Sequence, residues 1–386
     1  MGNILYFILI TFVFTSMAAS QSRPRARDIG VPFDGKTGEL NAITDIRGVE
    51  VGFTTLVSGQ GKKAVRTGVT AILPRGKDRG GRVFAAWDSL NGNGEMTGTT
   101  WIEESGGFGG PIMITNTHSV GIVRDAVIEW GTKRSTAKGY SGDFSLPVVA
   151  ETWDGFLNDI NGFHIKKEHV FRALDSARSG PVAEGNVGGG TGMVAHQFKA
   201  GTGTASRVLK KEDGGYTIGV LVQANYGSRR LLRIAGAPVG KEITELMPTE
   251  GKADDDTGSI IVVVATDAPL LPYQLKRLTK RASLGIAQLG GIGGNSSGDI
   301  FLAFSTANVD EASIVDKTSK VEMLPNEMMN PLFEATIQAT EEAIINALTA
   351  AETMTGYNGN TVYALPHDRL REALKKYNRL AETTRK

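Results

Sequence analysis

The stretch that most constrains the fold is a run of five β-branched residues at 260–264, Ile-Ile-Val-Val-Val. β-branched side chains favour extended backbone, and an uninterrupted apolar run is typical of a strand buried on both faces. We therefore predict a core strand over residues 259–267. The preceding residues 241–258 are polar and acidic and contain proline and glycine, so they predict a surface loop. Loop and strand meet abruptly at Gly258-Ser259, with no turn residue beyond the glycine.

Further short apolar runs, bounded by glycine and turn residues, predict more buried strands in the first two thirds of the chain. These runs are residues 69–73, 83–87, 111–115, 146–151 and 217–225. Apolar residues at spacings of three and four predict helices. The helices cover residues 119–130, 167–177, 271–289 and about 331–354, with a last one after Pro366. A glycine-rich loop over 290–298 leads into one more strand, 300–305. This mixture predicts layers of helices around β-sheets.

The composition narrows the possible functions. The chain has 386 residues, of which 40% are hydrophobic, so it can bury a large core in one domain or two. A formal net charge of +1 predicts no nucleic-acid partner and no attraction to an anionic membrane. The absence of cysteine excludes disulfides and thiolate metal sites, and the five histidines lack the spacing of a zinc site. A metal site made of carboxylates alone stays open, but no pattern in the sequence indicates one, and we expect neither a metal nor a cofactor.

Residues 1–20 have the pattern of a signal peptide. An apolar run over 4–17 is followed by small residues at 18–20, which predicts cleavage before Gln21. The run is shorter than the roughly 20 residues that span a bilayer. We expect an exported protein, periplasmic or secreted; an uncleaved membrane anchor is the alternative.

A serine hydroxyl is a poor nucleophile unless a base removes its proton. No histidine is evidently placed to do this for Ser259. An N-terminal serine has its own base, because its α-amine has a pKa of about 7.7–8.0. To free that amine, the Ser259 hydroxyl would attack the Gly258 carbonyl, and water would hydrolyse the resulting ester. Glycine suits the cleaved position because it has no side chain to block the attack.

The residues around this bond resemble the start of the β subunit in the DmpA/BapA family, also called the P1 family. Its members are L-aminopeptidase/D-esterases and β-peptidyl aminopeptidases. The similarity starts at Asp256-Thr257-Gly258-Ser259 and continues to residue 270. Other motifs agree in order within residues 30 to 355. They are 68–74 (GVTAILP), 110–112 (GPI), 115–117 (TNT), 147–155 (PVVAETWDG), 188–192 (GGGTG), 223–227 (QANYG) and 295–300 (NSSGDI).

This resemblance implies a fold and a processing event. The fold would be α+β, a four-layer αββα sandwich like that of N-terminal nucleophile hydrolases but with its own strand connectivity. The chain would split into an α chain, residues 21–258, and a β chain, residues 259–386, which stay together as one catalytic domain. The αβ units would form a homotetramer. The activity would be that of an aminopeptidase or amidase, with an acyl-enzyme formed on Ser259.

The catalytic roles of the family can be carried over residue by residue. The resemblance makes Ser259 the nucleophile and Asn225 the side chain that stabilises the oxyanion. Ser297 and Asp299 match partners that hydrogen-bond around the nucleophile. Some relatives have glutamate at the position of Asp299, so this shorter acid would act through water or through a shifted loop.

Substrate recognition would involve two further residues. Glu151 matches the acid that meets the free ammonium group of the substrate. Trp153 stands where a relative has an active-site tyrosine, and an indole has no phenol to share a proton, so that role does not transfer. The resemblance does not decide whether the substrates are L-peptides, D-amino acid amides or esters, or β-peptides.

Two other interpretations of the sequence are open. Residues 294–298 fit the G-x-S-x-G elbow of α/β-hydrolases, and Asp316 and His367 follow in the required order. That elbow links a strand to a helix, however, whereas this one precedes a strand. The second alternative is an inactive binding protein of the same fold that does not cut itself. The glycines of 188–192 could suggest phosphate binding, but they lack the lysine of a P-loop.

Overall fold

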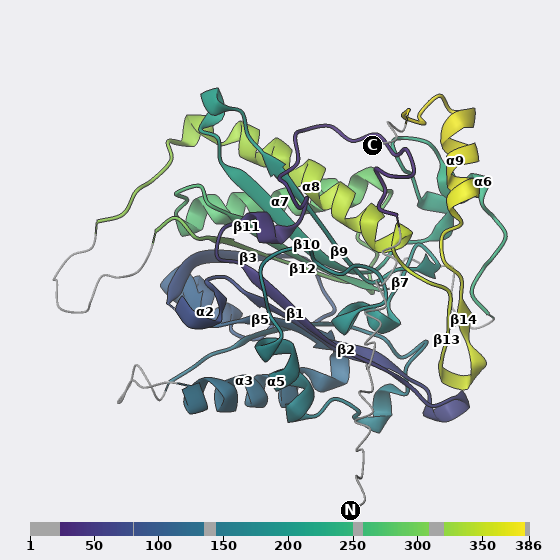
Figure 1. Cartoon of the computed structure of the whole chain (residues 1–386), viewed down its shortest axis with the longest axis horizontal. Helices are drawn as coiled ribbons and strands as arrows, with labels where there is room; N and C mark the ends of the chain where they lie inside the picture. The colour runs from purple at the N-terminus through teal and green to yellow at the C-terminus, as the bar shows by residue number, and fades with distance from the viewer. Residues whose placement is uncertain (1–23, 80, 135–143, 250–257, 309–319, 383–386) are drawn as a thin grey trace, which may run out of the picture.

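The computed structural model describes residues 24–79, 81–134, 144–249, 258–308 and 320–382 (Figure 1). Two β-sheets lie face to face, and each carries helices on its outer side. The layers therefore run helices, sheet, sheet, helices, which confirms the predicted α+β αββα sandwich. The expected signal peptide, residues 1–20, and the acidic residues 254–256 lie outside the described residues.

The larger sheet contains the β-branched run near its centre. Its six strands lie in the order β4-β3-β12-β11-β10-β9. Their bounds are β3 (Arg82–Gly92), β4 (Gly107–Gly109), β9 (Thr202–Val208), β10 (Thr217–Asn225), β11 (Ser259–Thr266) and β12 (Gly298–Ser305). β11 runs antiparallel to β10 and parallel to β12. The parallel pairing is possible because the helix α7 (Pro272–Gln288) forms the crossover between β11 and β12. With α8 (Asn330–Thr349), it covers the outer face of this sheet.

The smaller sheet has four strands in the order β1-β2-β5-β6. They are β1 (Glu50–Ser58), β2 (Val65–Leu73), β5 (Ile112–Asn116) and β6 (Val148–Thr152). The helices α3 (Val120–Arg134) and α5 (Lys167–Asp175) cover its outer face.

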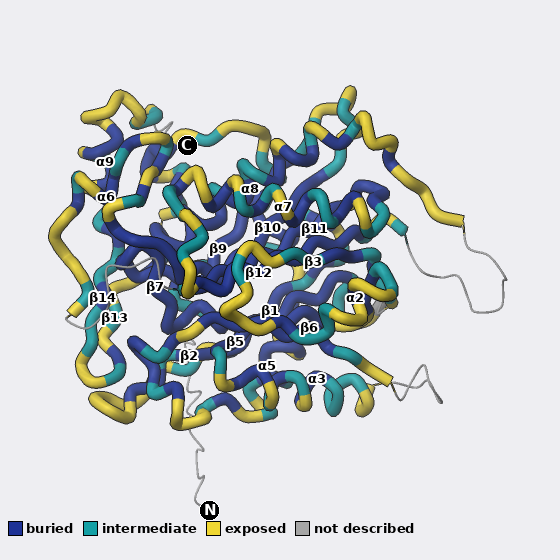
Figure 2. The backbone as a smooth tube through the Cα atoms, turned by 180° about the vertical axis from the view of Figure 1, so that it is seen from behind, coloured by how far each residue is buried: buried dark blue, intermediate teal, exposed yellow. Residues whose placement is uncertain are grey.

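The pleat of β11 divides its side chains between two cores. Ile260 and Val262 pack in the core between the larger sheet and its helices, whereas Ile261 and Val263 pack between the two sheets. All residues of β11 are buried, as predicted for a strand covered on both faces. Figure 2 shows the same pattern, with buried strands inside and exposed segments around them.

The remaining short elements lie around these layers. They are α1 (Gly76–Arg79), α2 (Thr99–Ser105), β7 (Val194–Ala195), β8 (Phe198–Lys199), α6 (Val239–Glu242), β13 (Met354–Thr355), β14 (Thr361–Val362) and α9 (His367–Lys376). Every predicted strand is present. The helix predicted over 331–354 ends earlier, at Thr349, because Met354 and Thr355 pair with β14 instead. Within the described residues, no helix is both long and apolar enough to span a membrane.

Candidate active site

Ser259 is the first residue of β11 and is 4% exposed. It lies between two strands of the same sheet, directly opposite Asn225 on β10 and Gly298 on β12. Side chains on a strand alternate between faces, so Ser259 faces the inter-sheet side together with Ile261. Asn225 faces the same side, because Gln223, two residues before it, donates across the inter-sheet space to the Thr152 hydroxyl at 2.8 Å. Directly opposite side chains have Cβ atoms about 4.5–5.5 Å apart.

The bond before Ser259 is enclosed by the neighbouring strands. The Gly298 N–H donates to the Gly258 carbonyl oxygen at 3.0 Å. A Cβ added to Gly258 would lie 2.0 Å from the carbonyl oxygen of Asn225. Residue 258 must therefore be glycine in this backbone, and its carbonyl is oriented by a fixed N–H donor.

The Asn225 amide is oriented from two sides. Its Oδ1 accepts the N–H of Val194 at 2.9 Å, and its Nδ2 donates to the Trp153 carbonyl oxygen at 2.9 Å. Because Nδ2 carries two hydrogens and this contact uses one, the other can serve a further acceptor. Such a preoriented donor can stabilise a developing oxyanion.

Ser297 and Asp299 form a buried pair at the start of β12. The Ser297 hydroxyl donates to Asp299 Oδ1 at 2.7 Å. Asn91 donates to Asp299 Oδ2 at 3.3 Å and also to the Gly294 carbonyl at 3.2 Å, which ties the glycine-rich loop to β3. The aspartate therefore contacts Ser297 directly.

Glu151 comes from the other sheet, near the end of β6, and is buried. Its Oε1 accepts the N–H of Glu95 at 3.0 Å, and its Oε2 accepts the Thr117 hydroxyl. A methyl group on Gly94 would lie 3.3 Å from both Glu151 Oε1 and the Cα of Gly298, so the carboxylate lies near the start of β12. Burial raises the pKa of Glu151 above its ordinary value, opposed by the hydrogen bonds from Thr117 and Glu95.

Trp153 contributes to the site through its backbone and presents its ring at the surface. Its carbonyl accepts the Asn225 amide, whereas its side chain is 48% exposed. The indole lies close to Gly155, where an added Cβ would be 2.5 Å from the ring. Trp153 therefore presents its ring at the surface while its backbone orients the oxyanion candidate.

The structure thus brings all the predicted site residues to one region, the ends of β6 and β10 and the starts of β11 and β12. The sequence alone did not reveal the partners that orient them. These are the N–H groups of Val194, Glu95 and Gly298, the carbonyl of Trp153, the Thr117 hydroxyl and the Asn91 amide. They come from distant segments, and most act through backbone atoms, so no residue type marks them.

The structure does not support the other functional sites that the sequence suggested. The serine of the G-x-S-x-G motif is Ser296, which is exposed and precedes the strand β12 instead of following a strand, so it does not fit a hydrolase elbow; Asp316 lies outside the described residues. The residues of 188–192 are all buried, with no room for a phosphate.

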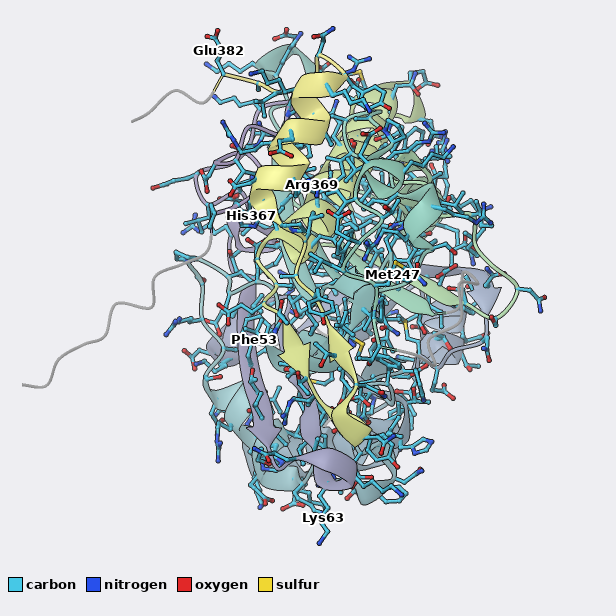
Figure 3. All side chains as sticks on the ribbon, turned by 90° about the vertical axis from the view of Figure 1, so that its right-hand side faces the viewer. Phe53, Lys63, Met247, His367, Arg369 and Glu382 are labelled. Carbon is cyan, nitrogen blue, oxygen red and sulfur yellow. The ribbon has the colours of Figure 1, made fainter. Side chains whose placement is uncertain are left out.

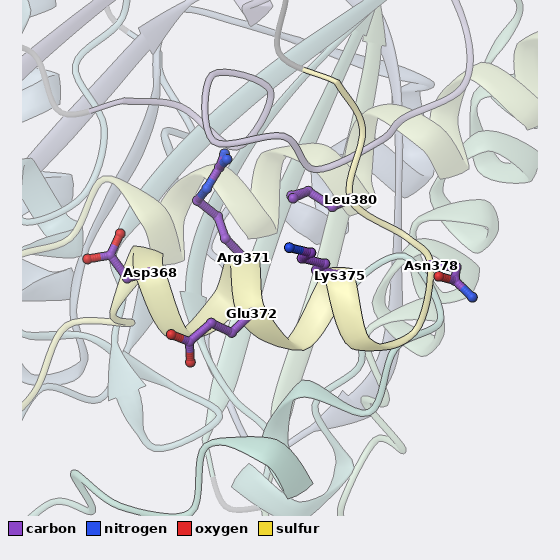
Figure 4. Close-up of a pocket in the computed structure, with 6 residues that line it drawn as sticks. All are labelled: Asp368, Arg371, Glu372, Lys375, Asn378 and Leu380. Carbon is purple, nitrogen blue, oxygen red and sulfur yellow. The ribbon is translucent and has the colours of Figure 1, made fainter.

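A surface cavity of about 720 Å³ lies along α9 and contains no predicted site residue (Figure 4). In the described part of the chain, no cluster of three or more metal-ligating side chains is present.

Several known proteins are similar to this chain. The family described as peptidase family S58 matches residues 41–362. A relative from Sphingosinicella microcystinivorans, named β-peptidyl aminopeptidase BapA, is 56% identical over 97% of this chain and 97% of its own. A second protein of that name, from Sphingosinicella xenopeptidilytica, is 47% identical over 95% of both chains.

Solved structures agree in fold. A β-aminopeptidase from Burkholderia sp. is 48% identical, with a TM-score of 0.84 over 92% of this chain and 99% of its own. The L-aminopeptidase D-Ala-esterase/amidase from Ochrobactrum anthropi is also 48% identical, with a TM-score of 0.86 over 93% of this chain and 100% of its own. That enzyme is described as a serine aminopeptidase and a new variant of the Ntn hydrolase fold.

Proposed function

The chain belongs to peptidase family S58 and is a serine aminopeptidase, and on that premise we propose that it cuts itself at Gly258–Ser259. Cleavage would produce an α chain, 21–258, and a β chain, 259–386, with Ser259 as the new N-terminal nucleophile. The observation that carries the proposal is the position of Ser259. It begins a buried central strand, preceded by a glycine whose carbonyl accepts a fixed N–H.

Self-cleavage would proceed by an N-to-O acyl shift. Ser259 Oγ attacks the carbonyl carbon of Gly258, and the negative charge develops on the carbonyl oxygen, to which Gly298 N–H already donates. Collapse breaks the C–N bond, and the Ser259 nitrogen takes up the proton that left Oγ and becomes a free amine. Water then hydrolyses the Gly258 ester, which leaves a carboxylate on Gly258 and a free hydroxyl on Ser259. Ser297 and Asp299 are assigned to orient the groups around this bond.

Turnover would use the same hydroxyl with the new amine as base. The α-amine accepts the Oγ proton as Ser259 attacks the substrate carbonyl. The Asn225 amide donates to the oxyanion, and the proton passes to the leaving amine. Water then releases the acyl group. The acid Glu151 would bind the substrate ammonium, which places the first peptide bond at the nucleophile and makes the enzyme an aminopeptidase.

The test of the proposal is intact mass combined with a substrate screen. The purified protein should contain two chains, and N-terminal sequencing should find Ser-Ile-Ile-Val. The screen uses aminoacyl p-nitroanilides of β-, L- and D-residues; β-aminoacyl amides come first because both curated relatives are named β-peptidyl aminopeptidases. A single uncut chain without amidase activity would instead favour the binding protein.

Glu151→Gln is expected to raise KM, or lower kcat/KM, for substrates with a free amine by about 10- to 100-fold. This corresponds to about 1.5–3 kcal/mol for a hydrogen bond to a charged group. Steady-state kinetics on one p-nitroanilide measure it, with Glu104→Gln on the exposed surface of α2 as the control. Equal cleavage of N-acetylated and free peptides by the wild type would contradict the assignment.

Gly258→Ala is expected to slow self-cleavage by about 10- to 100-fold. The added methyl would lie 2.0 Å from the Asn225 carbonyl oxygen, so the scissile bond must shift. Displacement of reacting atoms by about 1 Å can cost that much in rate. A time course on denaturing gels measures it. The control, Gly131→Ala, places a methyl in open space on α3 and should process normally; wild-type processing of Gly258→Ala would disprove the steric argument.

Export and assembly are part of the same proposal. The pattern of residues 1–20 supports removal of a signal peptide before Gln21. The burial of β11 between β10 and β12 supports lasting association of the α and β chains, and we expect the αβ units to form a homotetramer. N-terminal sequencing of the exported protein and light scattering under native conditions test these points.

A further inference from the structure

The hairpin of β7 and β8 contains an unusual turn. The two strands pair antiparallel and are joined by two residues, His196 and Gln197. Both have positive φ, 47° and 58°, although neither is glycine. Two-residue turns of this kind favour Asn-Gly, because a residue with a larger side chain is disfavoured there. The surroundings must therefore stabilise the turn.

The buried side chain of Arg229 contacts this turn directly. Its Nε donates to the His196 carbonyl at 3.1 Å, and its Nη2 donates to the Gln197 carbonyl at 2.8 Å. Its backbone N–H donates to Gln197 Oε1 at 3.1 Å, and its guanidinium lies over the Phe198 ring, 3.3 Å from the ring centre. Arg229 is only 3% exposed. One side chain therefore fixes both carbonyl groups of the turn.

The hairpin in turn orients the candidate oxyanion donor. Val194 of β7 donates its N–H to Asn225 Oδ1 at 2.9 Å, and His196 donates its N–H to the Tyr226 carbonyl at 2.7 Å. A shift of the turn would move the N–H group that sets the plane of the Asn225 amide.

The same guanidinium also binds residues 243–246, which we call the arm. Its Nη1 donates to the carbonyls of Ile243 and Glu245, each at 3.0 Å, and its Nη2 to that of Leu246 at 3.3 Å. On the outer side, Arg369 of α9 contacts the Glu245 carboxylate but is 44% exposed. Figure 3 shows Arg369 on the same face of the molecule as Met247, the residue after the arm.

We propose that Arg229 is a positioning residue for catalysis. By holding the 196–197 turn against the arm, it keeps the Val194 N–H in place and thereby keeps the Asn225 amide aimed at the oxyanion. The proposal rests on the proposed function, in which Asn225 is the oxyanion donor. A guanidinium can hold the turn and the arm together because its N–H donors spread over a plane and reach carbonyls on both sides. A lysine ammonium concentrates its donors on one nitrogen.

The test compares Arg229→Met with Arg369→Met, since both arginines contact the arm and only Arg229 contacts the turn. In processed enzyme, Arg229→Met should lower kcat by about 10-fold, less than the 10²–10³ typical for loss of an oxyanion donor. KM should stay within twofold, because Glu151 lies on the other sheet. Arg369→Met should keep wild-type kcat, since exposed ion pairs contribute little.

A rescue experiment separates positioning from general destabilisation. His196→Asn with Gln197→Gly installs the residues that this turn prefers. Added to Arg229→Met, the pair should recover most of the lost kcat, whereas a stabilising substitution elsewhere, such as Gly131→Ala, should recover none. If Arg229→Met does not fold, Arg229→Lys is compared with Arg369→Met in its place and should also lower kcat.

Unchanged kcat in folded Arg229→Met or Arg229→Lys would overturn the inference, and so would equal losses in the Arg369 variant. Failure to rescue kcat through the turn would overturn it as well. These outcomes differ from failure of the proposed function, because that failure would be seen in the wild type, as an uncut chain without amidase activity.

Discussion

Ser259→Ala should yield one uncut chain with no aminopeptidase activity. The substitution removes the Oγ that attacks Gly258, so the α-amine that serves as base is never released. Both the nucleophile and its base are therefore lost, and we expect kcat/KM to fall by at least about 10⁴-fold. Intact mass and p-nitroanilide hydrolysis measure the two losses separately.

Two controls belong to this prediction. Ser296→Ala removes an exposed hydroxyl from the loop before β12 and should leave processing and activity unchanged. The Ser259→Ala chain should fold, because a buried methyl fits beside the apolar residues 260–265 of the strand, so its melting temperature should stay close to that of the wild-type protein. Cleavage at 258–259 in the Ser259→Ala protein would exclude self-processing by this residue.

Asn225→Ala should have the second largest effect, a loss of about 10²–10³ in kcat, roughly 2.7–4 kcal/mol. The loss comes from the missing N–H at the oxyanion of the substrate. Self-cleavage should be slowed less, because the Gly258 carbonyl already accepts the Gly298 N–H. Asn225→Asp should be at least as harmful to turnover, since a carboxylate would repel the developing charge.

A structural role for Asn225 predicts a different result. The Asn225 side-chain amide forms hydrogen bonds with Val194 and Trp153. On this alternative, the alanine variant loses stability with little change in kcat. Measuring kcat and melting temperature on the same processed protein distinguishes the two roles. Asn161→Ala, at an exposed position, controls for handling of the variants. Wild-type kcat in folded Asn225→Ala would leave backbone N–H groups as the oxyanion donors.

Local sequence determined the elements around the cleaved bond. Residues 260–264 are all β-branched, so the strand needed no tertiary context to be predicted, and its burial on both faces followed from the absence of polar positions. The end of β10 at Asn225 was equally well predicted. The roles of Ser297, Asp299 and Glu151 came from family resemblance, because single polar residues in loops or at strand ends carry no distinctive pattern.

Tertiary structure alone decided how these residues meet. Ser259 faces Asn225 and Gly298 because of the register of β11 with two strands that lie more than thirty residues away on either side, and local propensity does not specify register. The need for glycine at 258 arises from the close approach of the Asn225 carbonyl, which no neighbouring residue reveals. Nothing in the local sequence distinguishes Arg229 from an exposed arginine. Only the fold surrounds it with the carbonyls that make a buried guanidinium stable, because hydrogen bonds must replace the water that burial removes.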